Sequence, residues 1–72
     1  MNDIEQKIMS IVHDAGRPVD INEIVQLLND TYNIRMVRQS VYRKAESLKR
    51  YRFLDKEFNE DLRCFEYSEV IE

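Results

Sequence analysis

Apolar residues recur every three or four positions in three parts of the chain, which is the spacing of one buried face on an α-helix. The first part predicts a helix over residues 3–15, because Gly16 suits a left-handed helix end and Pro18 prevents the helix from continuing. His13 lies on the polar face and is expected to be a solvated surface residue, whereas Met9 lies off the apolar stripe and indicates a partner contact. The stripe itself comprises Ile4, Ile8, Ile11, Val12 and Ala15.

The second periodic part predicts a helix over about residues 21–31. Asp20 followed by Glu23 has the spacing of a capping box, and Asn33 suits the left-handed residue that ends a helix. The preceding stretch, residues 17–20, is short and extended. The apolar stripe of this helix comprises Ile21, Ile24, Val25, Leu28 and Tyr32.

The third periodic part predicts a helix over about residues 37–51, with Val37, Val41, Ala45 and Leu48 on one face. Its N-terminus lacks an ordinary cap, because no Ser, Thr, Asp or Asn stands directly before Arg38. The pattern then alternates, which predicts a β-hairpin with strands over about 53–58 and 62–70 and a turn at 59–61. The chain is therefore expected to be one α+β domain over residues 1–72, with three helices followed by a hairpin.

Positive charge is concentrated in and around the third helix, although the chain carries a net charge of −3. Residues 35–56 hold eight basic and two acidic side chains, which gives this window a charge of +6. The rest of the chain holds three basic and twelve acidic side chains, which gives −9. Such asymmetry indicates an anionic partner, and a solvated helix face is the alternative interpretation.

A positively charged helix can enter the DNA major groove and place side chains from its N-terminal half against base edges. Here Arg43 could pair with guanine and Gln39 with adenine. The predicted base contacts are Gln39, Ser40, Tyr42, Arg43 and Ser47. The predicted phosphate contacts are Arg35, Arg38, Lys44, Lys49, Arg50 and Arg52. Glu46 points the same way as Arg43 and Arg50, so it could bridge them on a solvated face or accept a hydrogen bond from cytosine.

The segment "SVYRKAESLKRYRFL" resembles the recognition-helix segment of winged helix-turn-helix repressors of the ferric-uptake and phenolic-acid types. The matching residues are Ser40, Val41, Tyr42, Arg43, Leu48 and Leu54. The resemblance implies a winged-helix fold and implies DNA contacts by Tyr42 and Arg43. Two departures are clear: the glycine usual before the wing is replaced by "YRF", and the metal-binding residues of ferric-uptake regulators are missing. Tyr42 could instead pack over the corner between the second and third helices.

Catalytic and metal-binding chemistry is not evident in the sequence. A single histidine and a single cysteine, His13 and Cys64, cannot supply the three or four ligands of a transition-metal site. No glycine-rich phosphate loop or nucleophile–base set is present, so we expect neither an enzyme nor a cofactor nor a small-molecule ligand. The lone cysteine, the absence of an apolar run of about 18 residues and the polar N-terminus predict a cytoplasmic protein without a membrane partner.

The sequence therefore predicts a small transcriptional regulator, a repressor by resemblance, that binds double-stranded DNA. A weak homodimer is expected, because one recognition helix reads too few base pairs to address a genome uniquely. The candidate dimer contacts are the surface around Met9 and the C-terminal Val70 and Ile71. The alternative function is protein binding through an acidic hairpin, whose acids are Asp55, Glu57, Glu60 and Asp61.

Overall fold

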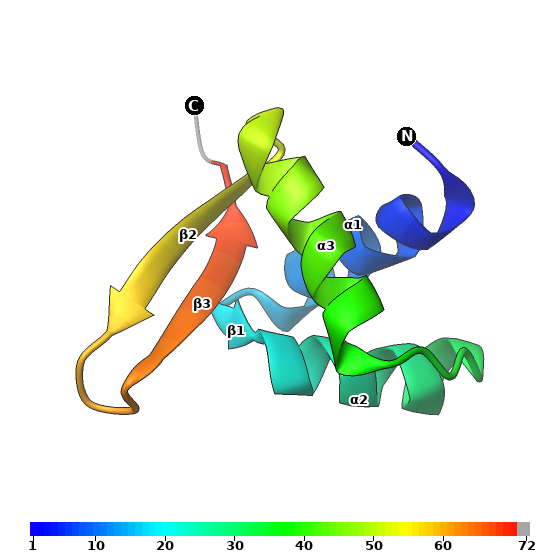
Figure 1. Ribbon diagram of the computed structural model, residues 1–72, viewed down its shortest axis with the longest axis horizontal. Coiled ribbons are helices and arrows are strands. Elements are labelled where there is room, and N and C mark those ends of the chain that lie inside the picture. Colours follow the sequence, from blue (N-terminus) through cyan, green and yellow to red (C-terminus); the bar gives the residue numbers. More distant parts are fainter. Residues whose placement is uncertain (71–72) are drawn as a thin grey trace.

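Three helices and one small antiparallel sheet make up residues 1–70, the part of the chain that the computed structural model describes (Figure 1). The elements are α1 (Asp3–Ala15), β1 (Val19–Asp20), α2 (Ile21–Tyr32), α3 (Arg38–Arg50), β2 (Leu54–Asn59) and β3 (Cys64–Glu69). The sheet order is β1-β3-β2, so the final hairpin gains a third, two-residue strand from the segment before α2. The predicted α+β class and the order of the elements are confirmed.

Polar residues define the ends of α1 and α2. The Asn2 side chain accepts a hydrogen bond from the Glu5 backbone N–H, and the Glu5 carboxylate accepts one from the Asn2 N–H. The two bonds form a capping box that was not among the predictions. Asp20 caps α2 by accepting from the Glu23 N–H, but the Glu23 carboxylate binds Arg17, so the predicted box is only half formed. Two left-handed residues, Gly16 and Asn33, end the helices as predicted, with α2 extending one residue further than expected, to Tyr32.

The third helix begins one residue later and ends one residue earlier than predicted. Val37 is the N-cap residue in an extended conformation and is 69% exposed, so its assignment to the buried stripe was wrong. No side chain caps this end of α3. At the other end, Arg52 adopts a left-handed φ of 67°, and the Phe53 N–H donates to the Leu48 carbonyl oxygen at 2.8 Å. Arg52 thus occupies the conformation that glycine usually takes after a helix.

The hairpin is shifted from its predicted position. Its register runs from Leu54 opposite Glu69 to Asn59 opposite Cys64, with residues 60–63 forming the loop, whereas strands over 53–58 and 62–70 with a turn at 59–61 were expected. Leu62 caused the error, because it was counted as a strand residue but lies exposed in the loop. Val70 follows β3 and is half-buried, and Ile71 lies outside the described residues.

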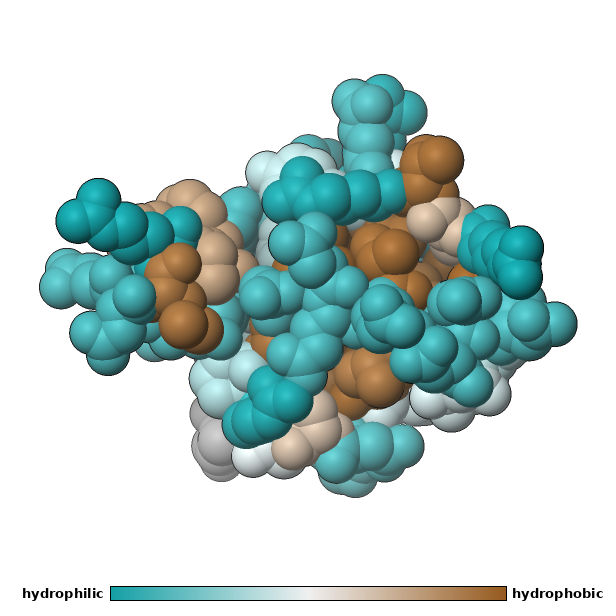
Figure 2. Space-filling model, turned by 90° about the horizontal axis from the view of Figure 1, so that it is seen from below, coloured by the Kyte–Doolittle hydropathy of each residue, from teal (hydrophilic) through white to brown (hydrophobic). Residues whose placement is uncertain are grey.

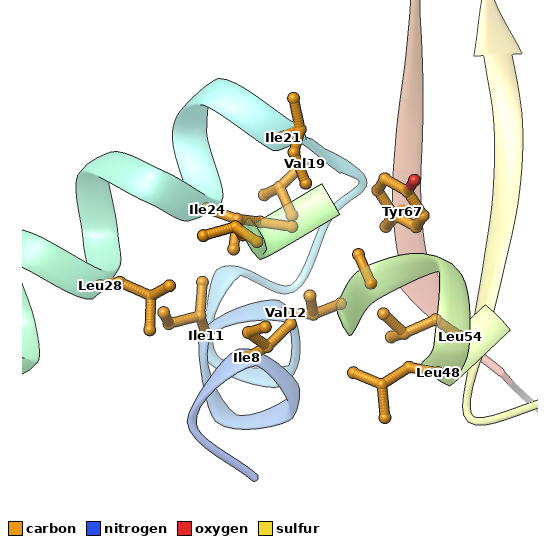
Figure 3. Close-up of a cluster of buried hydrophobic side chains, with 12 residues drawn as sticks. Ile8, Ile11, Val12, Val19, Ile21, Ile24, Leu28, Leu48, Leu54 and Tyr67 are labelled. Atoms are coloured by element: carbon orange, nitrogen blue, oxygen red, sulfur yellow. The ribbon is translucent and has the colours of Figure 1, made fainter. Parts of the chain in front are cut away.

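The core lies where the three helices meet the inner side of the sheet (Figure 3). Every helix and every strand contributes to it. Tyr67 brings β3 into contact with the helices, and Leu54 does the same for the start of β2. Met9 is half-buried and packs against this core, which leaves it less available to a partner than predicted. The buried residues are Ile8, Ile11, Val12, Val19, Ile21, Ile24, Leu28, Val41, Ala45, Leu48, Leu54 and Tyr67.

Candidate nucleic-acid interface

The outward face of α3 presents polar and positive side chains to solvent. Val41, Ala45 and Leu48 are buried on the opposite side and fix which way the helix faces. Gln39, Arg43 and Arg50, the residues directed away from that stripe, are all exposed. Within residues 1–70, neither arginine forms an ion pair, so both guanidinium groups are available to an external anion.

The N-terminal end of α3 is also positive and open. Arg38, the first helical residue, donates from Nε to the Asn22 Oδ1 at 2.9 Å, which ties α3 to the first turn of α2. Asn22 is neutral, so Arg38 keeps its full charge. Arg35 is exposed in the connection between the two helices. With no side-chain cap and no acid in the first turn, this end of the helix dipole favours an anion.

The other predicted contacts lie on the two flanks of α3. Ser40, Lys44 and Ser47 are half-buried on one flank, beside the outward face. Tyr42 and Lys49 are exposed on the flank that faces the hairpin. Arg52 is exposed just beyond the helix end. The predicted residues therefore share one side of the molecule, but Tyr42 and Lys49 are turned toward the hairpin.

Glu46 was expected on the outward face and instead binds the sheet. Its carboxylate accepts a hydrogen bond from the Tyr67 hydroxyl at 2.6 Å and from the Lys56 Nζ at 2.9 Å, and Lys49 lies 3.6 Å away. The side chains of Glu46 and Lys56 are 22% and 14% exposed. The prediction that Glu46 bridges Arg43 and Arg50 was wrong, because its carboxylate pairs with Lys56 of β2 and Lys49 instead. The alternative contact with cytosine stays a prediction.

This network shifts the acid–base properties of its members. Partial burial opposes ionisation of Glu46, but the hydrogen bonds from Tyr67 and Lys56 outweigh it and lower the pKa of the carboxyl group. Burial likewise disfavours the charged form of Lys56, but the contact with Glu46 prevails and raises the lysine pKa. Burial and the neighbouring Glu46 both raise the pKa of the Tyr67 hydroxyl. All three groups therefore keep their ordinary ionisation states across neutral pH.

Lys56 also contacts aromatic rings between α3 and the hairpin. Its ammonium group lies 4.6 Å from the ring centre of Phe65 and 5.2 Å from that of Tyr42. The same side chain is paired with Glu46, so Lys56 contributes no free charge to an interface. Among residues 1–70, the basic side chains in and around α3 that form no ion pair are Arg35, Arg38, Arg43, Lys44, Arg50 and Arg52, and Arg63 of the hairpin loop is also unpaired.

The hairpin has two chemically different faces, which the register defines. On its inner face, toward α3, lie Lys56, Phe58 and Phe65, and on its outer face lie Asp55 and Glu57. A hollow of about 370 Å³ is lined by these inner-face residues together with Tyr42 and Arg38. Arg63 of the hairpin loop also lines this hollow. Of the four acids predicted for the hairpin, Asp55 and Glu57 therefore lie on the outer face of β2, whereas Glu60 and Asp61 lie in the loop.

Several interactions that shape this region were not foreseen. The Tyr67–Glu46–Lys56 network and the Arg38–Asn22 contact depend on tertiary packing. His13 is exposed as expected, but its Nδ1 lies 2.7 Å from the Glu69 carboxylate, which raises the histidine pKa. Among residues 1–70, no three His, Cys, Asp or Glu side chains are grouped to hold a metal ion, and no helix has the length and apolarity to cross a membrane.

Comparisons with known proteins give no further assignment. No protein-family model matches the chain, and no curated protein or solved structure shows significant similarity to it.

Proposed function

We propose that this protein binds double-stranded DNA with sequence preference, by placing α3 in the major groove. The observation that supports this most is the outward face of α3, where Arg43 and Arg50 form no ion pair among residues 1–70 and the sole acid of the helix, Glu46, binds the sheet. An α-helix with its side chains is about 10–12 Å in diameter, which suits the width of about 12 Å of the major groove.

Within this proposal, different residues of α3 supply specificity and affinity. Arg43 and Gln39 lie at the centre of the outward face and would read base edges, with Ser40 and Ser47 beside them. Tyr42 would contact the edge of the site that adjoins the hairpin. The phosphate contacts would come from Arg35, Arg38, Lys44, Lys49, Arg50 and Arg52, and Lys49 would contribute least because Glu46 lies nearby.

Salt dependence tests whether the positive surface binds phosphates. If four to six phosphates are contacted, the logarithm of the affinity should fall with the logarithm of salt concentration with a slope of roughly −4 to −5 per protomer. Fluorescence anisotropy of a labelled duplex across salt concentrations measures this slope. A protein that binds no duplex even at low salt would contradict the proposal.

A pair of substitutions separates base reading from phosphate binding. Arg43→Ala should cost about 1–3 kcal/mol on the preferred site and relax the preference at one or two base pairs. Arg35→Ala should weaken the binding of all duplexes alike, and it should reduce the magnitude of the salt slope of binding by about one unit. The preferred site comes from selection on a random duplex library. Equal losses on preferred and random DNA for both variants would contradict these roles.

The proposal includes action as a small transcriptional repressor and weak self-association on two half-sites. One α3 would read only a few base pairs, so pairing would supply the missing specificity. A shallow surface lined by Met9, Arg52, Phe53, Glu69 and Val70 is the candidate contact. Analytical ultracentrifugation with and without a two-fold symmetric duplex tests it. A strict 1:1 complex on every symmetric site would refute the dimer.

Protein binding through the hairpin is a second candidate function. It is favoured by the acids Asp55 and Glu57 on the outer face and by the exposed Phe58, Leu62 and Phe65. At the hairpin end, at the left of Figure 2, hydrophobic residues reach the surface among hydrophilic ones. Weak duplex binding without salt dependence, together with binding of a basic protein, would favour this function over DNA binding.

A further inference from the structure

Strand β2 forms a free edge of the sheet. Among residues 1–70 it pairs only with β3, and β1 lies on the far edge. In Figure 1 no helix or strand of the described residues lies beyond β2 on its outer side. In an antiparallel edge strand, every second residue directs its backbone N–H and C=O outward, where another strand can pair with them. Six residues, Leu54–Asn59, provide this edge.

The side chains along the edge alternate in chemistry. Asp55 and Glu57 are exposed on the outer face and form no ion pair within residues 1–70. On the inner face, Lys56 is already held by Glu46, whereas Phe58 is 50% exposed. The Phe58 ring meets that of Phe65, itself 52% exposed, edge-on at 5.1 Å between centres. One face of the edge therefore offers carboxylates that form no ion pair within residues 1–70, and the other offers half-exposed aromatic rings.

We propose that β2 accepts an added strand from a partner protein in which basic side chains alternate with apolar ones. In such a strand, side chains directly across from β2 lie on the same face of the sheet. Basic residues would meet Asp55 and Glu57, and an apolar residue would cover Phe58. Backbone hydrogen bonds would supply affinity, and the alternation would select the partner. This surface does not involve the outward face of α3.

A second copy of the chain fits this edge poorly. Two identical antiparallel strands related by a two-fold axis pair residues with the same facing, so each register is centred on one residue. Centring on Asp55 or Glu57 opposes identical carboxylates, and centring on Lys56 opposes two lysines and sets Asp55 against Glu57. Centring on Phe58 avoids like charges but pairs only residues 57–59 of the strand and leaves Asp55 without a partner within β2. Like charges directly across a sheet are destabilising. The charge pattern therefore favours a basic partner over self-pairing.

Titration of the full chain with an eight-residue peptide tests the inference, using four Lys-Val repeats with blocked termini. The ¹⁵N–¹H amide signals of residues 54–59 should shift in a saturable manner. A peptide of the same composition in two blocks, four Lys then four Val, should bind at least tenfold more weakly. The double variant Asp55→Asn with Glu57→Gln should bind the alternating peptide about three- to tenfold more weakly than the unsubstituted protein does. The matched control, Glu60→Gln with Asp61→Asn in the loop, should change its affinity less than twofold.

Backbone methylation distinguishes strand addition from electrostatic attraction. One peptide is N-methylated on all lysines and another on all valines, so that each blocks hydrogen bonds on one edge of the added strand. One of them should bind like the parent, and the other should lose at least tenfold. The proposal would be overturned if the two methylated peptides bound equally well or lost affinity equally. It would also be overturned if the saturable amide shifts were confined to α3.

Two further results separate this inference from its alternatives. The peptide affinity should be unchanged in Arg43→Ala, so a failure of DNA binding would leave the inference standing. The signals of β2 should not depend on protein concentration in the absence of peptide. Concentration-dependent shifts of residues 54–59 would instead indicate self-pairing and would overturn the partner assignment.

Discussion

Replacing Arg52 with glycine should stabilise the fold and weaken DNA binding at the same time. Arg52 follows α3 with a φ of 67°, and the hydrogen bonds from Arg52 N–H to Lys49 and from Phe53 N–H to Leu48 close the helix end around it. This is a Schellman-type end, in which the left-handed residue is usually glycine. The exposed arginine side chain is at the same time a proposed phosphate contact.

The expected gain in stability comes from two opposing effects. A left-handed conformation costs an ordinary L-residue roughly 1–2 kcal/mol, because Cβ approaches the following carbonyl oxygen, and glycine avoids this cost. Glycine in turn raises the entropy of the unfolded chain, which offsets about 0.4–1 kcal/mol. The net stabilisation should be about 0.5–1 kcal/mol, which for a domain of this size corresponds to an increase in Tm of roughly 2–8 °C.

Thermal unfolding followed by circular dichroism measures the stability of each variant. The affinity for duplex DNA across salt concentrations shows how the loss of the arginine charge changes phosphate binding. Arg52→Gly should reduce the magnitude of the salt slope by about 0.9. Arg52→Asn should behave similarly, because asparagine tolerates the left-handed region. Arg52→Lys should change neither quantity. A Tm of Arg52→Gly equal to or below that of the unsubstituted protein would refute the strain argument, and an unchanged slope would remove Arg52 from the interface.

Three other predictions follow from the hairpin and its contact with α3. Tyr67→Phe removes the hydroxyl that donates to Glu46 and should lower the free energy of unfolding by about 1–2 kcal/mol in urea denaturation; no loss would mean that the bond is not made in solution. Because the folded pKa of Glu46 is lowered, its stabilising effect is present above the ordinary value of 4.5 and is lost as pH falls through the folded pKa. The Tm should therefore decrease more steeply with acidification below pH 4.5 in the unsubstituted protein than in Glu46→Gln, and parallel curves would contradict this. Glu60→Asn with Asp61→Asn should leave duplex affinity unchanged or raise it, and a large loss would show that these acids contact the DNA side.

The helices were predictable because their apolar positions repeat at one period over three turns. All ten residues of the α1 and α2 stripes are buried or half-buried against the core. Gly16, Pro18 and Asn33 mark the ends of these helices through backbone chemistry that acts locally. The start of α3 was less certain, since no capping side chain precedes it, and Val37 was accordingly misplaced.

The hairpin was harder to place because its apolar residues do not all face the core. Leu62 lies in the loop, and Phe58 and Phe65 are half-exposed on the inner face, so alternation alone gave the wrong turn. The third strand could not be inferred either. Val19 and Asp20 are too short a segment to show a period, and they become a strand only because β3 pairs with them.

The position of Glu46 could have been inferred from the strand rather than from the helix. Leu54, Lys56 and Phe58 share one face of β2, and because Leu54 and Phe58 are apolar, Lys56 must also point inward. A cation directed into a packed region requires an acidic partner. The only acid on the helix that covers this face is Glu46, so the pair follows from alternation in β2 together with the composition of α3. Helical periodicity alone places Glu46 closer to the solvent-exposed face of α3 than to its buried apolar stripe. The helical pattern by itself therefore gave the wrong position for the Glu46 side chain. The pairing neutralises the one acidic side chain of α3, and the Tyr67 hydroxyl bound to the same carboxylate joins α3 to the hairpin. The same contact that secures the fold thereby leaves the outward face of α3 without an acid.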